Sequence, residues 1–199
     1  DTARSRGLGD VYKRQMEKKL IWLDLEMTGL DPNAERIIEI FSAVTNEDLT
    51  EIIDGPNIVV SQPKEYIDAM DDWNQSHHGE SGLIEDVLNS KINQEEAEQE
   101  TLRFLREHVE KNASPLCGNT VWHDRKFLSL YMPELEDHFH YRCIDVSSVK
   151  ELTKRWRPEI SMQHSTKRAA HRAQADVYES INELRLSLIH ISEPTRPSS

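Results

Sequence analysis

The segment Leu20–Gly29, which reads LIWLDLEMTG, constrains the fold more than any other part of the chain. It begins with an apolar run, Leu20–Leu23, that is typical of a strand buried on both faces. Two carboxylates follow at Asp24 and Glu26, and residues two apart on a strand point to the same face. Their mutual repulsion would raise the pKa of each unless a cation lies between them. Divalent cations such as Mg²⁺ and Mn²⁺ prefer such oxygen ligands, so the segment indicates either a metal site or a solvated strand end with two unrelated acids.

Both ends of the chain are expected to be foreign to the domain. A DNA segment that encodes Asp10–Gln15 has a reverse complement that encodes Leu186–Ile191, and the pairing continues outward codon by codon. Folding gives no reason for an inverted repeat in the DNA, and the two ends resemble the translated adaptor of a transposon-based sequencing library. We therefore expect residues 1–15 and 186–199 to be adaptor-derived tails, and residues 16–185 to be one domain that is truncated at its C-terminal end.

Composition restricts the compartment and the partners of this chain. Cys117 and Cys143 have neither a CxxC nor a zinc-like spacing, and no apolar run reaches transmembrane length. We therefore expect a cytoplasmic protein with no disulfide framework and no membrane partner. The net charge of −12 argues against binding a long duplex, because such binding depends on many Lys or Arg contacts to phosphates. It does not argue against a short nucleic acid held through metal ions.

The order of the expected elements predicts a mixed α/β sheet flanked by helices. Turn signals at Gly29–Pro32 separate the first strand from apolar segments at Arg36–Val44 and Glu51–Val60, which predicts an antiparallel meander. Strands and helices alternate after that, which predicts helices packed against the sheet. The polar segment Met70–Leu83 matches no regular element. The later elements expected are a helix at Gln94–Lys111, a strand at Pro115–Gly118, a helix that starts at Asp124, a strand at Tyr141–Ile144, and helices at Asp145–Trp156 and Ala169–Arg185.

Three more residues could complete a metal site, although each has an ordinary alternative. Asp124 stands at the start of an expected helix, where an N-cap is the commoner role for Asp. Asp176 lies on the last expected helix and could be a surface acid. His171 precedes Asp176 by five positions and could be one of nine histidines without a special role. Taken singly, these residues leave both interpretations open.

Taken together, the three segments resemble a known family of nucleases. The order D-x-E-x-T-G-L-D-P from Asp24, G-N-x-x-x-x-D from Gly118 and H-x-A-x-x-D from His171 is similar to that of the DEDDh 3′-to-5′ exonucleases. The resemblance extends further to their oligoribonuclease branch and covers essentially all of residues 16–185. The blocks that carry it include RIIEI at 36–40, MDDWN at 70–74, LCGNT at 116–120, DRKFL at 124–128, HYR at 140–142 and DVSS at 145–148.

This resemblance implies a single-domain RNase H-like fold with a site for two divalent metal ions, Mg²⁺ or Mn²⁺. It implies that the ions are bound by Asp24, Glu26, Asp124 and Asp176, and that His171 acts as the general base. Elementary chemistry agrees, because two metal ions can activate a water and stabilise both the attacking and the leaving oxygen of phosphodiester hydrolysis. A histidine with a pKa near neutral can take up the proton of that water.

The resemblance also implies a substrate of very short single-stranded RNA, including dinucleotides. Leu30 resembles a wedge between the two terminal bases, and Trp73 resembles an aromatic platform for a base. A further set resembles a cap on the 5′ phosphate of the substrate, and it would require a homodimer because a partner subunit supplies part of it. This set consists of Thr120, Ser147 and Ser148 from one chain, with Tyr141 and Arg142 from the other.

Two other functions stay open on the sequence. A proofreading or tRNA-trimming DEDDh exonuclease would need an open groove for longer strands, against which the HYR and DVSS blocks argue. A non-catalytic nucleotide-binding module would not need all four acids together with His171. Two departures from the family pattern also concern the site: Thr120 stands where Ser is usual, and the residues at 121–123 before Asp124 are bulkier than usual.

Overall fold

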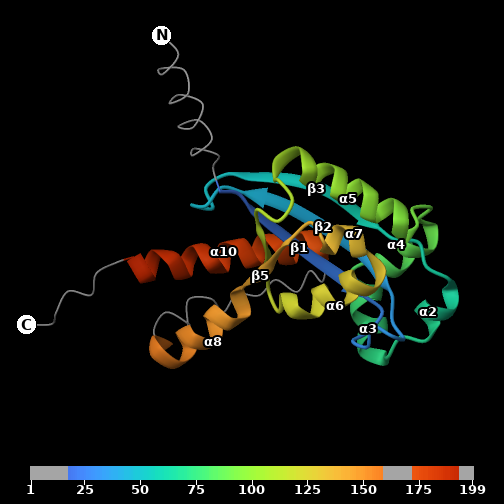
Figure 1. Cartoon of the computed structure of the whole chain (residues 1–199). Coiled ribbons are helices and arrows are strands. Elements are labelled where there is room, and N and C mark those ends of the chain that lie inside the picture. Colours follow the sequence, from blue (N-terminus) through green and yellow to red (C-terminus); the bar gives the residue numbers. More distant parts are fainter. Residues whose placement is uncertain (1–17, 159–171, 193–199) are drawn as a thin grey trace, which may run out of the picture.

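A computed structural model describes residues 18–158 and 172–192, and its centre is a five-stranded sheet (Figure 1). The strands are β1 (Leu20–Met27), β2 (Ile37–Thr45), β3 (Ile52–Val59), β4 (Pro115–Gly118) and β5 (His140–Asp145). Their order in the sheet is β3–β2–β1–β4–β5. The first three strands form antiparallel pairs, whereas β4 pairs in parallel with both β1 and β5. The mixed sheet and its antiparallel beginning are thus confirmed.

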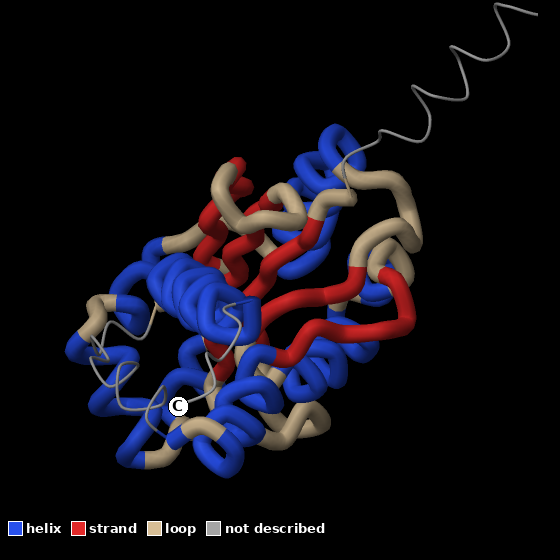
Figure 2. Tube along the Cα trace, turned by 90° about the vertical axis from the view of Figure 1, so that its left-hand side faces the viewer, coloured by secondary structure: helices blue, strands red, loops and turns tan. Residues whose placement is uncertain are grey.

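Helices cover both faces of this sheet. α5 (Gln94–His108) packs on β2 and β3, and α6 (Val121–Tyr131) packs on β1, β4 and β5. On the other face, α10 (Ala173–Ser192) packs on β1 and β2, and α8 (Val146–Trp156) packs on α10 and β4. Figure 2 shows α10 nearly end-on beside the strands. The shorter helices are α2 (Lys64–Asp68), α3 (Asp72–Glu80), α4 (Leu83–Asn89) and α7 (Pro133–Glu136).

The alternation of side chains along β1 decides which face receives the acidic residues. Leu23 belongs to the hydrophobic core under α5 and α6. Trp22 points the opposite way and belongs to the core that Val177 of α10 helps to form. Asp24 and Glu26 share the parity of Trp22, so they lie on the face that α10 covers. The buried strand and the last helix therefore meet where β1 changes from apolar to acidic.

The structure differs from the expectation at Met70–Leu83, where it contains the helix α3. Asp71 caps this helix, because its carboxylate accepts a hydrogen bond from the backbone N–H of Asn74 at 2.8 Å. Within α3 only Asn74 and His78 are buried, so the helix has no apolar stripe. The absence of that stripe explains why hydrophobic periodicity does not reveal it.

The helix that carries Asp124 also begins earlier than expected. Thr120 adopts a left-handed conformation with φ of 57°, and α6 starts directly after it at Val121, which is buried. Asp124 therefore lies within the first turn of α6 and not at its N-cap. The ordinary alternative for Asp124, a helix cap, is wrong.

The last helix extends further than expected. It was predicted to end at Arg185, but α10 continues to Ser192. Ser187 is buried within this extension, and its hydroxyl donates to the carbonyl oxygen of Glu183 at 3.0 Å. The foreign origin of residues 186–199 stays a prediction, and residues 169–171 of the expected helix lie outside the described residues. Despite its length, neither α10 nor any other helix in the described part of the chain is long and apolar enough to cross a membrane.

Candidate active site

Three carboxylates from two elements converge beside the C-terminal half of β1. Asp24 and Glu26 come from β1, and Asp176 comes from the first turn of α10. One carboxylate oxygen from each residue lies within 4.8 Å of those from the other two, and all three residues are half-buried. Converging oxygen donors of this kind are what Mg²⁺ and Mn²⁺ require.

The fourth predicted ligand, Asp124, approaches the same part of β1 from α6. Its residue is 5% exposed, and its Oδ1 accepts a hydrogen bond from the backbone N–H of Leu25 at 3.2 Å. Asp124 is not part of the group whose oxygens lie within 4.8 Å of one another. Burial is the largest cause of the raised pKa of Asp24, and among neighbouring charges that of Asp124 raises this pKa most. The structure thus brings all four acids to one strand, with Asp124 held against its backbone.

Burial and mutual repulsion oppose the ionisation of these carboxylates. Burial, followed by the negative charges of Asp176 and Glu39, raises the pKa of Glu26 to about 8. Burial also raises the pKa of Asp124 to about 7, although backbone hydrogen bonds act in the other direction. A cation among the carboxylates removes the repulsion and favours their charged forms. Both the donor set and its electrostatics therefore fit divalent metal ions.

These pKa values predict how the stability of the metal-free protein depends on pH. Between the ordinary glutamate value of 4.5 and about 8, Glu26 keeps its proton in the folded state and loses it on unfolding. The unfolded state then binds fewer protons, so stability should fall as pH rises through this window. Mg²⁺ should raise the melting temperature by more at about pH 8 than at about pH 6, since protons compete with the ion at the lower pH. Thermal unfolding with and without Mg²⁺ measures this, and an equal Mg²⁺ effect at both pH values would contradict it.

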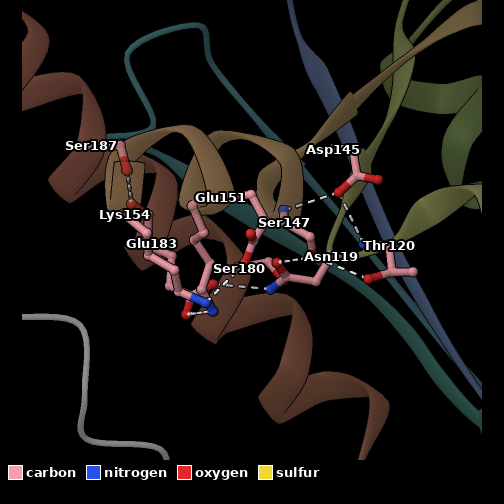
Figure 3. Close-up of polar contacts among 10 residues, drawn as sticks. Asn119, Thr120, Asp145, Ser147, Glu151, Lys154, Ser180, Glu183 and Ser187 are labelled. Carbon is pink, nitrogen blue, oxygen red and sulfur yellow. Dashed lines mark hydrogen bonds and ion pairs between the residues drawn. The ribbon is translucent and has the colours of Figure 1, made fainter. Parts of the chain in front are cut away.

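Thr120 and Ser147, two of the predicted cap residues, are hydrogen-bonded neighbours (Figure 3). Their hydroxyl oxygens are 3.0 Å apart, and the backbone N–H groups of both residues donate to Oδ1 of Asp145 at 3.1 Å and 2.9 Å. The hydroxyl of Ser147 donates to Oδ1 of Asn119 at 3.0 Å. Nδ2 of Asn119 in turn donates to Oγ of Ser180 on α10 at 2.7 Å. This network connects the predicted cap to the helix that supplies the third carboxylate.

The other predicted substrate contacts lie on exposed surfaces. Trp73 is 57% exposed and stacks on His77, with 3.9 Å between the ring centroids. Tyr141 is 74% exposed, and the guanidinium of Arg142 lies 5.4 Å from the centre of its ring. Both belong to β5, the edge strand of the sheet, where a second chain can approach. Apart from Thr120 and Ser147, the predicted substrate contacts are five residues, and all five are exposed: Leu30, Trp73, Tyr141, Arg142 and Ser148.

The predicted general base, His171, lies outside the described residues, so its role stays a prediction. The next residue, Arg172, is described, and its guanidinium binds the buried carboxylate of Glu39 on β2. Sequence reasoning missed both Arg172 and Glu39. The signal that could have found Glu39 is a lone acid within the apolar segment RIIEI, because an acid in a strand buried throughout needs a partner.

Known proteins match most of this chain. The model of the exonuclease family RNase_T matches residues 21–184. A protein of Shewanella loihica named Oligoribonuclease is 54% identical over 169 residues, which are 85% of this chain and 93% of that protein. Another of the same name from Bordetella pertussis is 53% identical over 175 residues, or 88% of this chain and 96% of that protein.

Solved structures of exonucleases share the fold. Exonuclease I of Methylocaldum szegediense superposes with a TM-score of 0.58 at 19% identity over 89% of this chain. The zinc-bound E. coli ExoI–ssDNA complex superposes with a TM-score of 0.64 at 17% identity over 86% of this chain. The chain spans 41% and 40% of these two larger proteins. At such identities the likeness establishes the fold, which is the predicted RNase H-like arrangement.

Proposed function

We propose a reaction and a substrate class from one premise: the chain belongs to the exonuclease family, as a member of its oligoribonuclease group. It is a 3′-to-5′ exoribonuclease that hydrolyses short RNA to mononucleotides. The observation that carries this proposal is the convergence of Asp24, Glu26 and Asp176 within 4.8 Å, with Asp124 bound to the same strand. A nucleotide-binding module without catalysis would gain nothing from four acids that repel one another.

The four acids would hold two divalent ions, Mg²⁺ or Mn²⁺. Bound there, the ions supply a water of lowered pKa and stabilise the attacking and leaving oxygens of an in-line displacement. The residues of the chain supply the geometry: β1 fixes Asp24 and Glu26 on one face, while α10 brings Asp176 to them. His171, which directly precedes the described Arg172, would accept the proton of the attacking water.

The substrate is a short single strand, with the dinucleotide as its limiting case. Exposed Leu30 would separate the terminal bases and exposed Trp73 would stack on one of them, a contact that tolerates any sequence. Thr120, Ser147 and Ser148 would bind the 5′ phosphate. The net charge of −12 gives long RNA little general attraction, so these local contacts must provide the affinity. Relatives named Oligoribonuclease favour this function over proofreading or tRNA trimming.

The active unit is a homodimer in this proposal. Tyr141 and Arg142 are exposed on the edge strand β5, which supports their use by a second copy of the chain. Arg142 would then complete the phosphate cap of the partner through a charge-assisted hydrogen bond. A cytoplasmic location belongs to the same proposal, and the free thiols of Cys117 and Cys143 are what a reducing compartment would give.

Hydrolysis of defined RNAs tests this function. Purified protein with Mn²⁺ should convert a 5′-phosphorylated dinucleotide to mononucleotides, and should shorten a heptanucleotide from its 3′ end at lower efficiency. Removing the 5′ phosphate should weaken dinucleotide binding, because a dinucleotide has few other contacts. Chromatography of the products distinguishes the possibilities. Equal or better degradation of long strands would overturn the short-RNA specificity, and an unchanged dinucleotide would overturn the activity.

The same assay tests whether Arg142 acts across a dimer. The variants Arg142→Ala and Asp124→Asn should each be nearly inactive on the dinucleotide. A mixture that exchanges subunits should regain activity, because one site of the mixed dimer combines an intact acid set with an intact borrowed arginine. A mixture no more active than the two variants apart, with exchange confirmed by mass spectrometry, would contradict a shared site.

A further inference from the structure

Beside the acidic cluster, the half-buried guanidinium of Arg172 forms an ion pair with the buried carboxylate of Glu39. Glu39 of β2 is 0% exposed and lies opposite Glu26 in the sheet. The guanidinium of Arg172 binds it by two nitrogens: Nη2 lies 2.7 Å from Oε1, while Nε lies 2.9 Å from Oε1 and 3.1 Å from Oε2. The backbone N–H of Ala173 donates to Oε2 at 3.0 Å. Both oxygens of this buried carboxylate therefore have partners.

Stability alone is a poor explanation for this pair. Removing the carboxylate of Glu39 from water costs much of what its attraction to Arg172 returns, and well-packed apolar residues often serve as well or better. The two-nitrogen contact instead fixes distance and orientation, because the planar guanidinium matches a carboxylate only in a narrow geometry. A contact of this kind is suited to holding one element in one place.

The element that Glu39 and Arg172 hold is the beginning of α10. Ala173 is the first residue of that helix, and its N–H group has no partner inside the helix, so the carboxylate of Glu39 acts as a cap supplied by another strand. The N–H of Asp176 bonds back to the carbonyl oxygen of Arg172 at 3.2 Å. Asp176 therefore lies one turn from the anchored point. His171 directly precedes Arg172 in the sequence.

Arg172 also contacts the corner between α3 and α4. Its Nη1 lies 3.0 Å from Oδ2 of Asp86 on α4 and 3.5 Å from the carbonyl oxygen of Ser81. Ser81 is the C-cap of α3, the helix that carries Trp73. A single guanidinium thus joins β2, the start of α10 and the α3–α4 corner.

We propose that Glu39 and Arg172 are positioning residues for the hydrolytic reaction: their contact sets the first turn of α10, and through it Asp176, against the carboxylates of β1. This inference rests on the proposed metal-dependent function. The pair touches neither substrate nor reacting atoms, and it acts by holding the groups that do. Supporting residues of this type commonly contribute about 10–100-fold to metal affinity or activity.

The test compares Arg172→Gln, Arg172→Lys and Glu39→Gln with the control Asp86→Asn, which removes only the 49% exposed partner of the same arginine. In the first three variants we expect kcat at saturating Mn²⁺ to fall about 10–100-fold and Mn²⁺ affinity to fall about tenfold, with the dinucleotide KM within about twofold. Lysine should not rescue kcat, since it keeps the charge but not the two-nitrogen contact. Asp86→Asn should stay within about twofold of wild type.

Readouts other than activity separate positioning from mere support of the fold. In metal-free Glu39→Gln, amide exchange should speed up in the first turn of α10 while β1 stays protected. The double variant Glu39→Gln/Arg172→Gln should lose no more kcat than either single variant, as expected for residues that act as one unit. If Arg172→Gln does not fold, the isosteric Glu39→Gln carries the same measurements. Folded variants with wild-type kcat and Mn²⁺ affinity would overturn the proposal. If wild-type protein binds Mn²⁺ but cleaves no RNA, the proposed function fails, and the Mn²⁺ titrations still decide the role of the pair.

Discussion

Asp24→Asn should abolish hydrolysis and leave the metal-free protein as stable as wild type or more stable. The rate should fall about 10³-fold or more, because the metal ions contribute several kcal/mol of transition-state stabilisation and each 1.4 kcal/mol is tenfold in rate. Burial, followed by the charges of Asp124, Glu26 and other acids, raises the pKa of Asp24 in the folded state. An amide removes that repulsion, so the melting temperature without metal should hold or rise, while the Mg²⁺-induced increase should shrink.

A matched control separates this effect from general loss of charge. Asp48→Asn makes the same chemical change at an exposed residue in the turn after β2, next to the N-terminal end of β1. Its activity, melting temperature and Mg²⁺ response should equal those of wild type. Full activity of Asp24→Asn would exclude this carboxylate as a metal ligand. A lower melting temperature with the Mg²⁺-induced increase retained would assign Asp24 a structural role instead.

His171→Ala should bind metal and dinucleotide nearly as well as wild type but turn over slowly. Loss of a general base costs about 10²–10⁴ in rate, and the loss should appear in kcat with KM little changed. The rate of wild type should fall as the pH drops through the range in which an ordinary imidazole takes up a proton, about 6.5. In the variant that inflection should disappear. Single-turnover kinetics across pH, with Mn²⁺ binding measured separately, provides the test.

The control for this variant is His108→Ala, which removes a histidine from α5 on the opposite face of the sheet. It should keep both the rate and the pH profile. Failure of His171→Ala to bind Mn²⁺ would show that His171 is a metal ligand, and another residue would then have to be the general base. An unchanged rate with an unchanged pH profile would remove His171 from the reaction.

The sequence was informative where one physical rule dominated. The apolar run Leu20–Leu23 gave the buried central strand, and strand parity placed Asp24 and Glu26 on one face. Parity cannot say which face, because that depends on where α10 packs. The structure answers this through Trp22, which shares the parity of the acids and lies in the core with α10. The sequence therefore predicts that the two acids of β1 lie on one face of the sheet, but it does not predict which face.

Other features depend on contacts between distant residues and were missed for that reason. The pair Glu39–Arg172 joins residues 133 positions apart, and neither has a periodic or spaced pattern to reveal it. α3 was missed because it is a polar surface helix whose signal is its cap at Asp71. The start of α6 was placed too late because the left-handed conformation of Thr120 is unusual for a β-branched residue.

The most direct test of the account is the location of bound Mn²⁺ in crystals of the wild-type protein, by anomalous diffraction. We expect two anomalous peaks among the carboxylates of Asp24, Glu26, Asp124 and Asp176, roughly 3.5–4 Å apart, which is the spacing of two-metal sites in nucleases and phosphatases. Both peaks should be lost or weakened in Asp24→Asn. A saturated crystal with no pair of peaks there, or with Mn²⁺ bound only to other acids, would contradict the two-metal site on which the proposed reaction depends.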